Sequence, residues 1–310
     1  MKRYLTIDGG TTNTRIYLVE DYKITDTVKI NVGSNNPGAR EILTKEINTE
    51  IKTLLSKHDL TEKDINRILA SGMITSEFGL YKLDHIIAPA GISELNQNSC
   101  EVVLEEISSI PISFICGVKT VGDTLEQINM MRGEETEIIG IAKAEYGSCI
   151  YVLPGSHSKI IRTDKDGRIL DFISTLTGEL IAALTKSTIL STCVDLNAKL
   201  CEKALRDGYD YAKEYGINET LLKTRTLANI LKKDSDYIYS FFMGTVLCDE
   251  INAILKMPEN TVVISGREEI KRAISLLLEK YSDKNIIALD KESVDSSTVN
   301  GAIKIFEYNK

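Results

Sequence analysis

The 310-residue chain contains no tryptophan and only three histidines, His58, His85 and His157, which are scattered along its length. Histidines placed this way form no obvious histidine metal site, so we expect any metal ion to be held by oxygen ligands, as Mg²⁺ is. The six cysteines include no C-x-x-C pair, and their spacing matches no zinc pattern. We therefore expect free thiols in a reducing compartment.

Long apolar runs and an excess of basic charge are also missing. No apolar stretch approaches the roughly 18–20 residues that a membrane span requires. The N-terminal sequence reaches Asp8 too soon to hold the apolar core of a signal peptide. With 37 basic and 45 acidic residues the net charge is −8, a poor match for nucleic-acid phosphates. We therefore expect a cytoplasmic protein without a membrane or nucleic-acid partner.

The composition that is present is that of a globular protein. Hydrophobic residues make up 43% of the chain and charged residues 26%, which allows a sizeable core. The length suits one large or two medium domains. In the first half the apolar pattern predicts strands and helices in the order βββαβαβ. The predicted strands are 4–7, 15–19, 24–32, 65–69 and 112–115, and the predicted helices are 42–55 and 99–108.

The second half repeats this plan: each half starts with a strand, a polar glycine turn, a strand, a turn and a strand. The predicted strands are 149–153, 159–162, 168–173, 261–264 and 286–289. The predicted helices are 180–190, 196–205, 221–231, 238–255 and 299–306. This duplication predicts two α/β domains, residues 1–144 and 145–310, with a ligand cleft between them. We expect a helix at 134–144 to cross from one domain to the other.

A run of polar residues and glycines separates the first two predicted strands. It consists of Asp8, Gly9, Gly10, Thr11, Thr12 and Asn13. The glycines allow a tight turn whose N–H groups and hydroxyls can bind a phosphate, and Asp8 can hold Mg²⁺ through water. No Gly-Lys-Ser/Thr follows, and a strand rather than a helix comes next, so the run is neither a Walker A loop nor a dinucleotide fingerprint. A plain β-hairpin is the alternative.

Two later turns resemble phosphate or nucleotide contacts. Gly155, Ser156 and His157 occupy the same place in the second half that the first turn occupies in the first half. Ser265 and Gly266 end a buried strand just before a helix, and a helix N-terminus behind a glycine suits a nucleotide. Ordinary strand turns would also explain both segments. His157 is either a structural hydrogen-bonding residue or a base.

Two further motifs carry polar groups at predicted helix starts. Within Met-Arg-Gly-Glu-Glu-Thr at 131–136, Arg132 can bind a carboxylate or phosphate with two parallel hydrogen bonds. Glu134 and Glu135 can orient that arginine or bind a substrate, although acidic residues also suit the first turn of a helix. A Thr-Leu-Thr-Gly-Glu sequence at 175–179 contains a plausible helix cap, which leaves its other polar residues unexplained.

Taken together and in this order, the motifs resemble the 2-dehydro-3-deoxygalactonokinase family of the sugar kinase/actin/Hsp70 superfamily. The resemblance extends over essentially the whole chain. It implies two ribonuclease H-like (actin-like ATPase) domains around a nucleotide cleft. It also implies an ATP-dependent and Mg²⁺-dependent phosphotransferase with an alcohol acceptor, which phosphorylates 2-dehydro-3-deoxy-D-galactonate on its 6-hydroxyl in galactonate catabolism.

The same resemblance implies roles for the matching residues. The nucleotide-binding set is Asp8, Gly9, Gly10, Thr11, Thr12, Asn13, Gly155, Ser156, His157, Ser265 and Gly266, in which Asp8 also serves the metal. For the reaction itself we expect a catalytic set of Asp123, Glu134 and Arg132. Asp123 is the first candidate for the general base because it follows the predicted strand 112–115 near the cleft, and Glu134 is the second. The expected substrate-binding set is Arg132, Glu135, Ser71, Gly72, Thr177 and Glu179, and Arg132 is the cation expected to meet the carboxylate of a sugar acid. The chain departs from the family pattern at Leu80, where a tryptophan is expected, and at Asn129, where an acidic residue is expected.

Two other functions stay open at this stage. One is a kinase for another sugar, sugar acid or N-acetyl sugar. The other is a non-catalytic nucleotide switch like those of the actin and chaperone branches, which would need a peptide-binding domain or polymer surface beyond the two halves. The expected partner is a small sugar acid, and a homodimer is an open alternative.

Overall fold

The computed structural model describes residues 1–308, and the contacts within it divide the chain into two units. Unit 1 consists of Met1–Glu145, Asp164–Asp171 and Lys291–Lys310, and unit 2 consists of Tyr146–Thr163 and Phe172–Asp290. The division expected from the sequence placed everything after residue 144 in the second half. The structure differs because the C-terminal helix packs within unit 1.

Unit 1 is built on a six-stranded sheet with the strand order β3-β2-β1-β4-β7-β6, and a smaller sheet has the order β5-β8-β9. Its strands are β1 (Arg3–Gly9), β2 (Thr14–Glu20), β3 (Lys23–Ile30), β4 (Arg67–Gly72), β5 (Ile86–Ile87), β6 (Cys100–Val102), β7 (Ile112–Phe114), β8 (Val118–Thr120) and β9 (Asn129–Met131). Its helices are α1 (Ala39–Lys57), α2 (Ile92–Gln97), α3 (Glu134–Ile141) and α10 (Lys291–Glu307), with short 3₁₀ turns η1 (Glu62–Asp64), η2 (Met73–Thr75), η3 (Leu125–Gln127) and η4 (Ala144–Tyr146).

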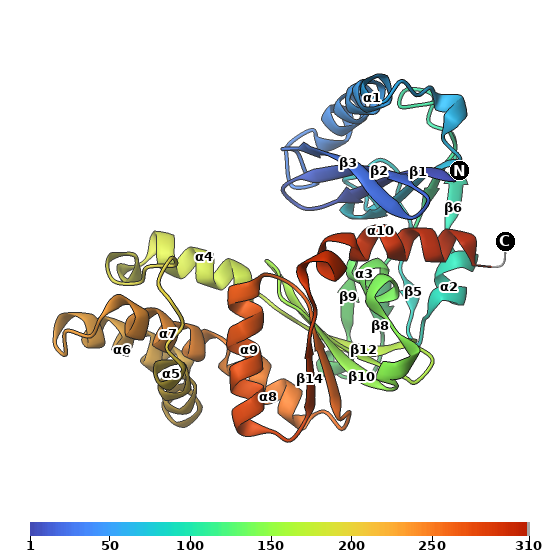
Figure 1. Cartoon of the computed structure of the whole chain (residues 1–310). Coiled ribbons are helices and arrows are strands. Elements are labelled where there is room, and N and C mark those ends of the chain that lie inside the picture. The colour runs from blue at the N-terminus through green and yellow to red at the C-terminus, as the bar shows by residue number, and fades with distance from the viewer. Residues whose placement is uncertain (309–310) are drawn as a thin grey trace. The chain divides into compact units, whose positions relative to one another are not determined.

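Helices cover both faces of the main sheet of unit 1 (Figure 1). Side chains alternate between faces along a strand, so Leu5 and Ile7 of β1 point to one side and Tyr4 to the other. Leu5 and Ile7 are buried in the core that α1 completes. The ring of Tyr4 meets Phe306 of α10 edge-on, with ring centroids 6.0 Å apart. The sheet is therefore the middle of three layers, with α1 on one face and α10 on the other.

Helix α1 confirms the prediction made from the spacing of apolar residues. Its buried side chains include Leu43, Ile47, Ile51 and Leu54, which recur every three or four positions and so form one apolar stripe. This stripe packs against the sheet in the core of unit 1.

Unit 2 repeats the pattern with a five-stranded sheet of order β12-β11-β10-β13-β14. In both units the first three strands lie side by side in the sheet, as the duplication predicted. The first strand of each unit also pairs parallel with a later strand, β1 with β4 and β10 with β13. Its strands are β10 (Cys149–Leu153), β11 (Ser158–Thr163), β12 (Ile169–Thr175), β13 (Thr261–Ile264) and β14 (Asn285–Ala288). Its helices are α4 (Thr177–Ser187), α5 (Glu202–Tyr215), α6 (Ile217–Asn229), α7 (Ser235–Val246), α8 (Cys248–Lys256) and α9 (Glu268–Tyr281), with a 3₁₀ turn η5 (Ile189–Thr192).

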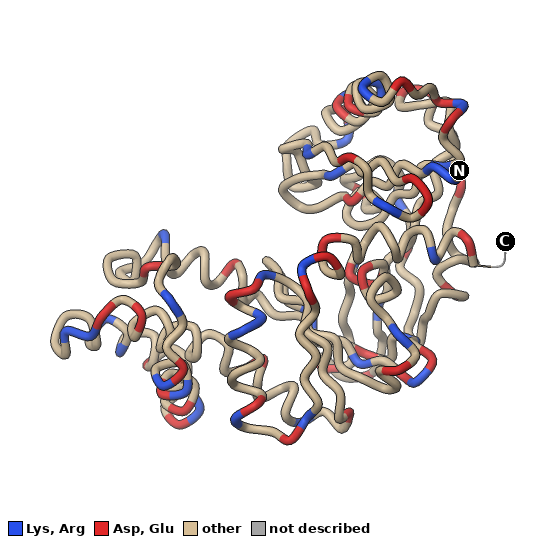
Figure 2. Tube along the Cα trace, viewed as in Figure 1, with Lys and Arg blue, Asp and Glu red and all other residues tan. Residues whose placement is uncertain are grey.

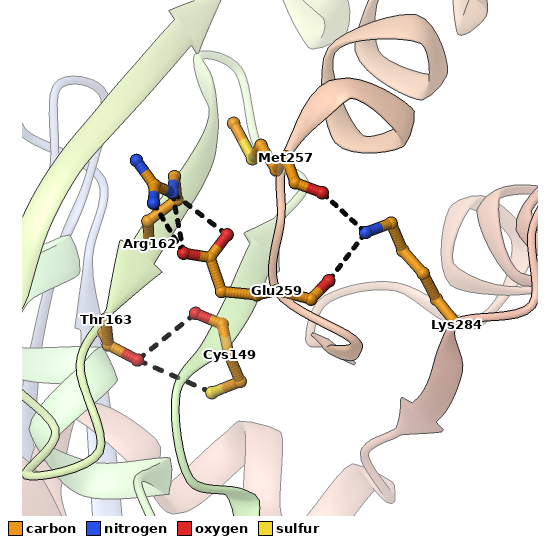
Figure 3. A network of polar contacts seen from close by, with 6 residues as sticks. All are labelled: Cys149, Arg162, Thr163, Met257, Glu259 and Lys284. Carbon is orange, nitrogen blue, oxygen red and sulfur yellow. Dashed lines mark hydrogen bonds and ion pairs between the residues drawn. The ribbon is translucent and has the colours of Figure 1, made fainter.

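A polar network joins one end of the unit 2 sheet (Figure 3). Arg162 at the end of β11 donates hydrogen bonds to both carboxylate oxygens of the buried Glu259, at 2.7–3.0 Å. Lys284, just before β14, donates to the carbonyl oxygens of Met257 (2.7 Å) and Glu259 (2.6 Å). Because β13 begins at Thr261, two residues after Glu259, this network ties the segment before β13 to β11 and to the residue that precedes β14.

Two predicted helices are wrong. Residues 100–102 of the predicted helix 99–108 form strand β6, because they pair antiparallel with β7, Cys100 opposite Phe114. The β-branched Val102 suits that pairing. The predicted helix 196–205 begins later, at Glu202, because the Asp195 carboxylate accepts the N–H of Asn197 and forms a turn before it.

Glycines let helices α3 and α10 approach closely inside unit 1. A Cβ added at Gly140 would overlap the carbonyl oxygen of Ser297, and one added at Gly301 would overlap that of Thr136. Lys304 also donates to the carbonyl oxygen of Gly140, at 2.9 Å. Helix α3 therefore packs within unit 1, where a helix crossing between the domains was expected.

Figure 2 shows basic and acidic residues interspersed along each unit over the described residues. Within residues 1–308 no single helix is long and apolar enough to cross a membrane, although α7 and α8, bent by 47° at their junction, pass that test when taken together.

The glycine contact between α3 and α10 makes Gly301→Val a test of unit 1. We expect this variant to lower the free energy of unfolding by about 1–3 kcal/mol, because the added side chain has no room against the α3 backbone. Urea unfolding followed by circular dichroism measures the change. Glu292→Ala, an exposed position on the same helix, is the control. An equal response of both variants would show that the close approach does not matter.

Candidate functional site

The first polar turn lies at the end of strand β1 in unit 1. The register of β1 and β2 places Asp8 opposite Arg15, and the Asp8 Oδ2 and Arg15 Nη1 atoms are 3.8 Å apart. The N–H of Gly10 donates to the carbonyl oxygen of Asn13, at 2.9 Å, which closes a tight turn. The turn therefore presents a carboxylate beside backbone N–H groups and the hydroxyls of Thr11 and Thr12.

Strand β4 runs parallel to β1 and ends beside it, with Ser71 next to Asp8 and Gly72 next to Gly9. Gly72 has a φ of 81° and Gly133 a φ of 114°, which only glycine adopts readily. A Cβ at Gly133 would lie 3.2 Å from the Cα of Gly72, so the start of α3 approaches the end of β4 closely. The structure thus gathers three sequence motifs around Asp8.

The surroundings of Asp8 change the pKa of its carboxyl group. Burial raises the pKa of Asp8, Arg15 opposes that rise, and the negative charge of Glu134 adds to it. The carboxylates of Asp8 and Glu134 are therefore close enough for their charges to repel each other.

In the described part of the chain no group of three or more His, Cys, Asp or Glu residues could hold a metal ion. One or two carboxylates still fit Mg²⁺, which keeps several waters and takes further oxygens from phosphate.

The guanidinium group of Arg132 is occupied by the chain itself. Its Nη1 donates to the carbonyl oxygen and the hydroxyl of Thr75, at 2.9 and 2.6 Å. Its Nη2 donates to the carbonyl oxygen of Leu83, at 2.8 Å, and lies 3.2 Å from Nδ1 of His85. These contacts use both terminal nitrogens, so the geometry gives Arg132 a role in holding the 75–85 segment.

Glu135 is fully buried directly under the Gly133 turn. Both of its carboxylate oxygens accept the N–H of Gly133, at 2.8 and 2.9 Å. Burial raises its pKa to about 8, and the charge of Glu134 contributes to the rise. The side chain thus supports the turn from inside the protein, while the neighbouring Glu134 is half-buried and accepts the N–H of Arg132.

The sequence-predicted base Asp123 lies apart from these groups in chain position and environment. It is exposed in the loop between β8 and η3, where its backbone N–H donates to Oε1 of Gln127, at 2.9 Å. The charged groups that shift the pKa of Asp8 are Arg15 and Glu134. Of the two candidate bases, Glu134 is therefore the one that the structure places near Asp8.

A second group of predicted residues comes together within unit 2. The β10–β11 turn packs closely against the start of α4. A Cβ added at Gly178 would overlap the carbonyl oxygen of Gly155, so the contact requires a glycine. The N–H of Glu179 donates to the carbonyl oxygen of Ser156, at 3.1 Å. The side chain of Glu179 lies 3.0 Å from Nε2 of His157. His157 thus has a carboxylate partner on α4.

The end of strand β13 reaches the same turn. The N–H of Ser265 donates to the carbonyl oxygen of Val152, at 2.9 Å, and Gly266 lies against Pro154. The structure therefore gathers within unit 2 the predicted residues Gly155, Ser156, His157, Thr177, Glu179, Ser265 and Gly266.

Glu250 of helix α8 belongs to this group but was missed from the sequence. It is 1% exposed, and its Oε1 accepts hydrogen bonds from the hydroxyls of Thr175 (2.5 Å) and Thr177. Its Oε2 accepts none from the described residues. The two threonines belong to the unexplained Thr-Leu-Thr-Gly-Glu motif, and nothing local in the sequence of α8 points to them.

The sheet order, repeated in both units, and the glycine turns after the first strand of each define a class. The fold is that of actin-like ATPases and sugar kinases, as the sequence predicted. The activator of 2-hydroxyisocaproyl-CoA dehydratase from Clostridium difficile, solved with bound ADPNP, has this fold, with a TM-score of 0.51 and 12% identity over 98% of this chain and 95% of that one.

The chain belongs to the 2-keto-3-deoxy-galactonokinase family, whose sequence model matches residues 8–301. It is 28% identical over 192 residues to 2-dehydro-3-deoxygalactonokinase of Escherichia coli, and the matched residues cover 61% of this chain and 58% of that protein. A candidate 2-dehydro-3-deoxygalactonokinase from Sinorhizobium meliloti has a similar structure, with a TM-score of 0.78 and 21% identity over 98% of this chain and 99% of that one.

A second curated relative, named as a probable 2-dehydro-3-deoxygalactonokinase of Rhizobium meliloti, is 27% identical over 197 residues. The match covers 62% of this chain and 59% of that relative. The chain therefore spans less than two thirds of the length of the curated relatives that it matches.

The buried Glu135 makes the stability of the protein depend on pH. Its pKa in the folded protein, about 8, lies above the ordinary value of 4.5, so the folded state holds the proton more tightly. The stabilisation is complete below pH 4.5 and is lost as the pH rises to about 8. In Glu135→Gln we expect a shallower fall in the free energy of unfolding over this range, measured by urea unfolding at several pH values. The exposed Glu126→Gln is the control, and an unchanged slope in Glu135→Gln would contradict the assignment.

Glu250 gives a second prediction about stability. Glu250→Ala leaves the hydroxyls of Thr175 and Thr177 without their acceptor, so we expect a loss of about 1–3 kcal/mol in the free energy of unfolding. Glu250→Gln keeps one acceptor oxygen and is expected to lose less. Asp249→Ala, exposed on the same helix, is the matched control in thermal and urea unfolding. A loss in the control as large as that in Glu250→Ala would refute this role.

Proposed function

We propose that the protein is an ATP-dependent kinase that transfers a phosphoryl group to the 6-hydroxyl of 2-dehydro-3-deoxy-D-galactonate. Membership of the family supports the reaction class. The observation that carries the proposal is the gathering of Asp8, the end of β4 and the start of α3 around one turn of N–H groups and hydroxyls. Such a turn suits a phosphate together with a metal ion.

The proposed nucleotide contacts follow the glycine turns of each unit. In unit 1 the residues Gly9 to Asn13 offer N–H groups and hydroxyls to phosphate oxygens. In unit 2 the turn at Gly155–His157 offers a second phosphate-facing set, and Ser265–Gly266 is proposed to contact adenosine. Mg²⁺, held by Asp8 through water, would neutralise charge on the phosphates.

The transfer needs a hydroxyl nucleophile and an acceptor for its proton. The substrate oxygen attacks the γ-phosphorus, the bond from that phosphorus to the β–γ bridging oxygen breaks, and ADP leaves. The hydroxyl proton passes to a carboxylate. We propose Glu134 for this role because its charge acts on Asp8, which places it near the proposed phosphate site. Asp123 is kept as the second candidate. The other proposed substrate contacts are Ser71, Gly72, Glu135, Thr177 and Glu179.

Arg132 enters the proposal in a changed form. The sequence assigned it to the substrate carboxylate, but its terminal nitrogens contact Thr75, Leu83 and His85. We propose that Arg132 positions the segment after β4 and thereby the ends of the strands that carry Ser71 and Asp8. A cytoplasmic location and a homodimer stay predictions.

ATP turnover with Mg²⁺, measured with and without 2-dehydro-3-deoxy-D-galactonate and its gluconate epimer, tests the function. We expect turnover that depends on the galactonate form and is lost in Asp8→Asn, which keeps the shape of the side chain and removes its charge. Glu134→Gln is expected to lower kcat by about 10²–10⁴-fold, and Asp123→Asn to leave it near the wild-type value. The opposite order of these two variants would exchange their roles.

The epimer and other acceptors separate the remaining alternatives. Turnover with another sugar or sugar acid alone would keep the kinase class and change the substrate. Folded protein that binds ATP and is stimulated by no acceptor would favour the non-catalytic switch.

A further inference from the structure

A cavity of about 620 Å³ opens in unit 1 beside the first polar turn. Its volume falls within the range of small-molecule sites. The lining residues are Ser34, Asn35, Asn36, Pro37, Gly38, Ala39, Arg40, Glu41, Glu77 and Phe78. None of them was assigned a role from the sequence.

Both walls of this cavity are attached to the candidate site. On one side the N–H groups of Ser34 and Asn35 donate to the carbonyl oxygens of Gly10 and Thr11, at 3.2 and 3.0 Å. On the other side Glu77 and Phe78 follow η2, the 3₁₀ turn that begins directly after Gly72. One wall is therefore hydrogen-bonded to the turn that follows Asp8, and the other follows the strand end that carries Ser71.

Ser34 provides a polar group that has no partner within the described residues. The residue is only 5% exposed, and its hydroxyl oxygen makes no hydrogen bond to the rest of residues 1–308. Leaving a buried hydroxyl unpaired costs free energy, so such a group calls for a partner from outside the chain. Because Ser34 lines the cavity, a bound molecule with hydroxyl groups can supply that partner.

Arg40 supplies a positive charge in the same cavity. It is exposed and makes no ion pair with another described residue. It stands in the first turn of α1, where a cation opposes the helix dipole, and α1 begins without a side-chain cap. The first turn of α1, with its uncapped N–H groups, and Arg40 both line the cavity, so their positive charge favours an anion there. The stability of α1 gives no reason for an arginine at this position.

The remaining lining groups suit a polyhydroxylated ligand. Phe78 is 58% exposed and offers an apolar surface to the C–H face of a sugar. The carboxylates of Glu41 and Glu77 can accept hydrogen bonds from sugar hydroxyls, and the charge of Glu77 is partly balanced by Lys82, 4.0 Å away. Since the net charge of the chain is −8 and the two signs are interspersed, attraction for an acid must come from a local cation (Figure 2).

We propose that this cavity binds the sugar acid, with Arg40 pairing the substrate carboxylate and the Ser34 hydroxyl bonding a sugar hydroxyl. The inference rests on the proposed function and gives that reaction its specificity site. It also replaces Arg132, whose terminal nitrogens are already occupied, as the cation that meets the acid group.

Steady-state kinetics of Arg40→Gln test the assignment. We expect the KM for the sugar acid to rise about 10-fold or more, because a charge-assisted hydrogen bond is lost, while the KM for ATP stays unchanged. Ser34→Ala is expected to raise the KM for the acid by a smaller factor. Lys45→Gln, an exposed cation farther along the same helix, is the control and should change neither constant. Arg40→Gln should unfold at the wild-type temperature or slightly above it, which separates binding from a structural role.

Direct binding separates this inference from the proposed function. Calorimetry with D-galactonate, a sugar acid added without ATP, measures the cavity alone. Binding by the wild type that weakens in Arg40→Gln supports the cavity even if no acceptor is phosphorylated, and in that case only the proposed function falls. Turnover of the acid with the same KM in wild type and Arg40→Gln overturns the cavity assignment and leaves the kinase in place. Absence of both binding and turnover overturns both.

Discussion

The parallel pairing of β1 with β4 is the constraint on which unit 1 depends. It places Asp8 beside Ser71 and Gly9 beside Gly72, so the carboxylate and the glycine turn meet at one edge of the sheet. The close approach of Gly133 to Gly72 then brings the start of α3 to that edge. Hydrogen bonds from the loop before α1 to the same turn add the wall of the cavity. The pairing of these two strands thus fixes the edge of the sheet to which the other polar segments are then joined.

Unit 2 also brings a polar turn and a helix start together, but with different residues. Its glycine contact joins Gly155 to Gly178, and its buried glutamate is Glu250 of α8, whereas the buried glutamate of unit 1 is Glu135 of α3. Each carboxylate holds a helix start by accepting hydrogen bonds, from an N–H in one unit and from hydroxyls in the other. In both units a buried glutamate thus accepts hydrogen bonds at the start of the helix that lies close to the candidate site.

The sequence predicted those parts of the fold that depend on short-range patterns. The apolar pattern of a strand and the three- or four-residue spacing of apolar residues in α1 lie within short segments, so the sequence alone reveals them. Strand β6 was mistaken for a helix because its stability comes from pairing with β7, which no local pattern reveals.

The candidate site divides in the same way. The glycine turns were recognisable because their residues are contiguous. The partners of Arg132 lie 47 to 57 residues before it, and Glu250 lies 73 and 75 residues after its threonines. An arginine used inside the protein and one that faces a ligand look alike in sequence, since the difference depends on contacts between distant segments.

The position of α10 has a consequence for the order in which the chain is assembled. Helix α10 covers one face of the sheet to which β1 belongs, and the whole of unit 2 lies between β1 and α10 in sequence. During synthesis that face stays uncovered until α10 has left the ribosome, and by then unit 2 has emerged before it. Unit 1 is therefore completed only after unit 2 has been synthesised, and until then one face of its sheet is exposed.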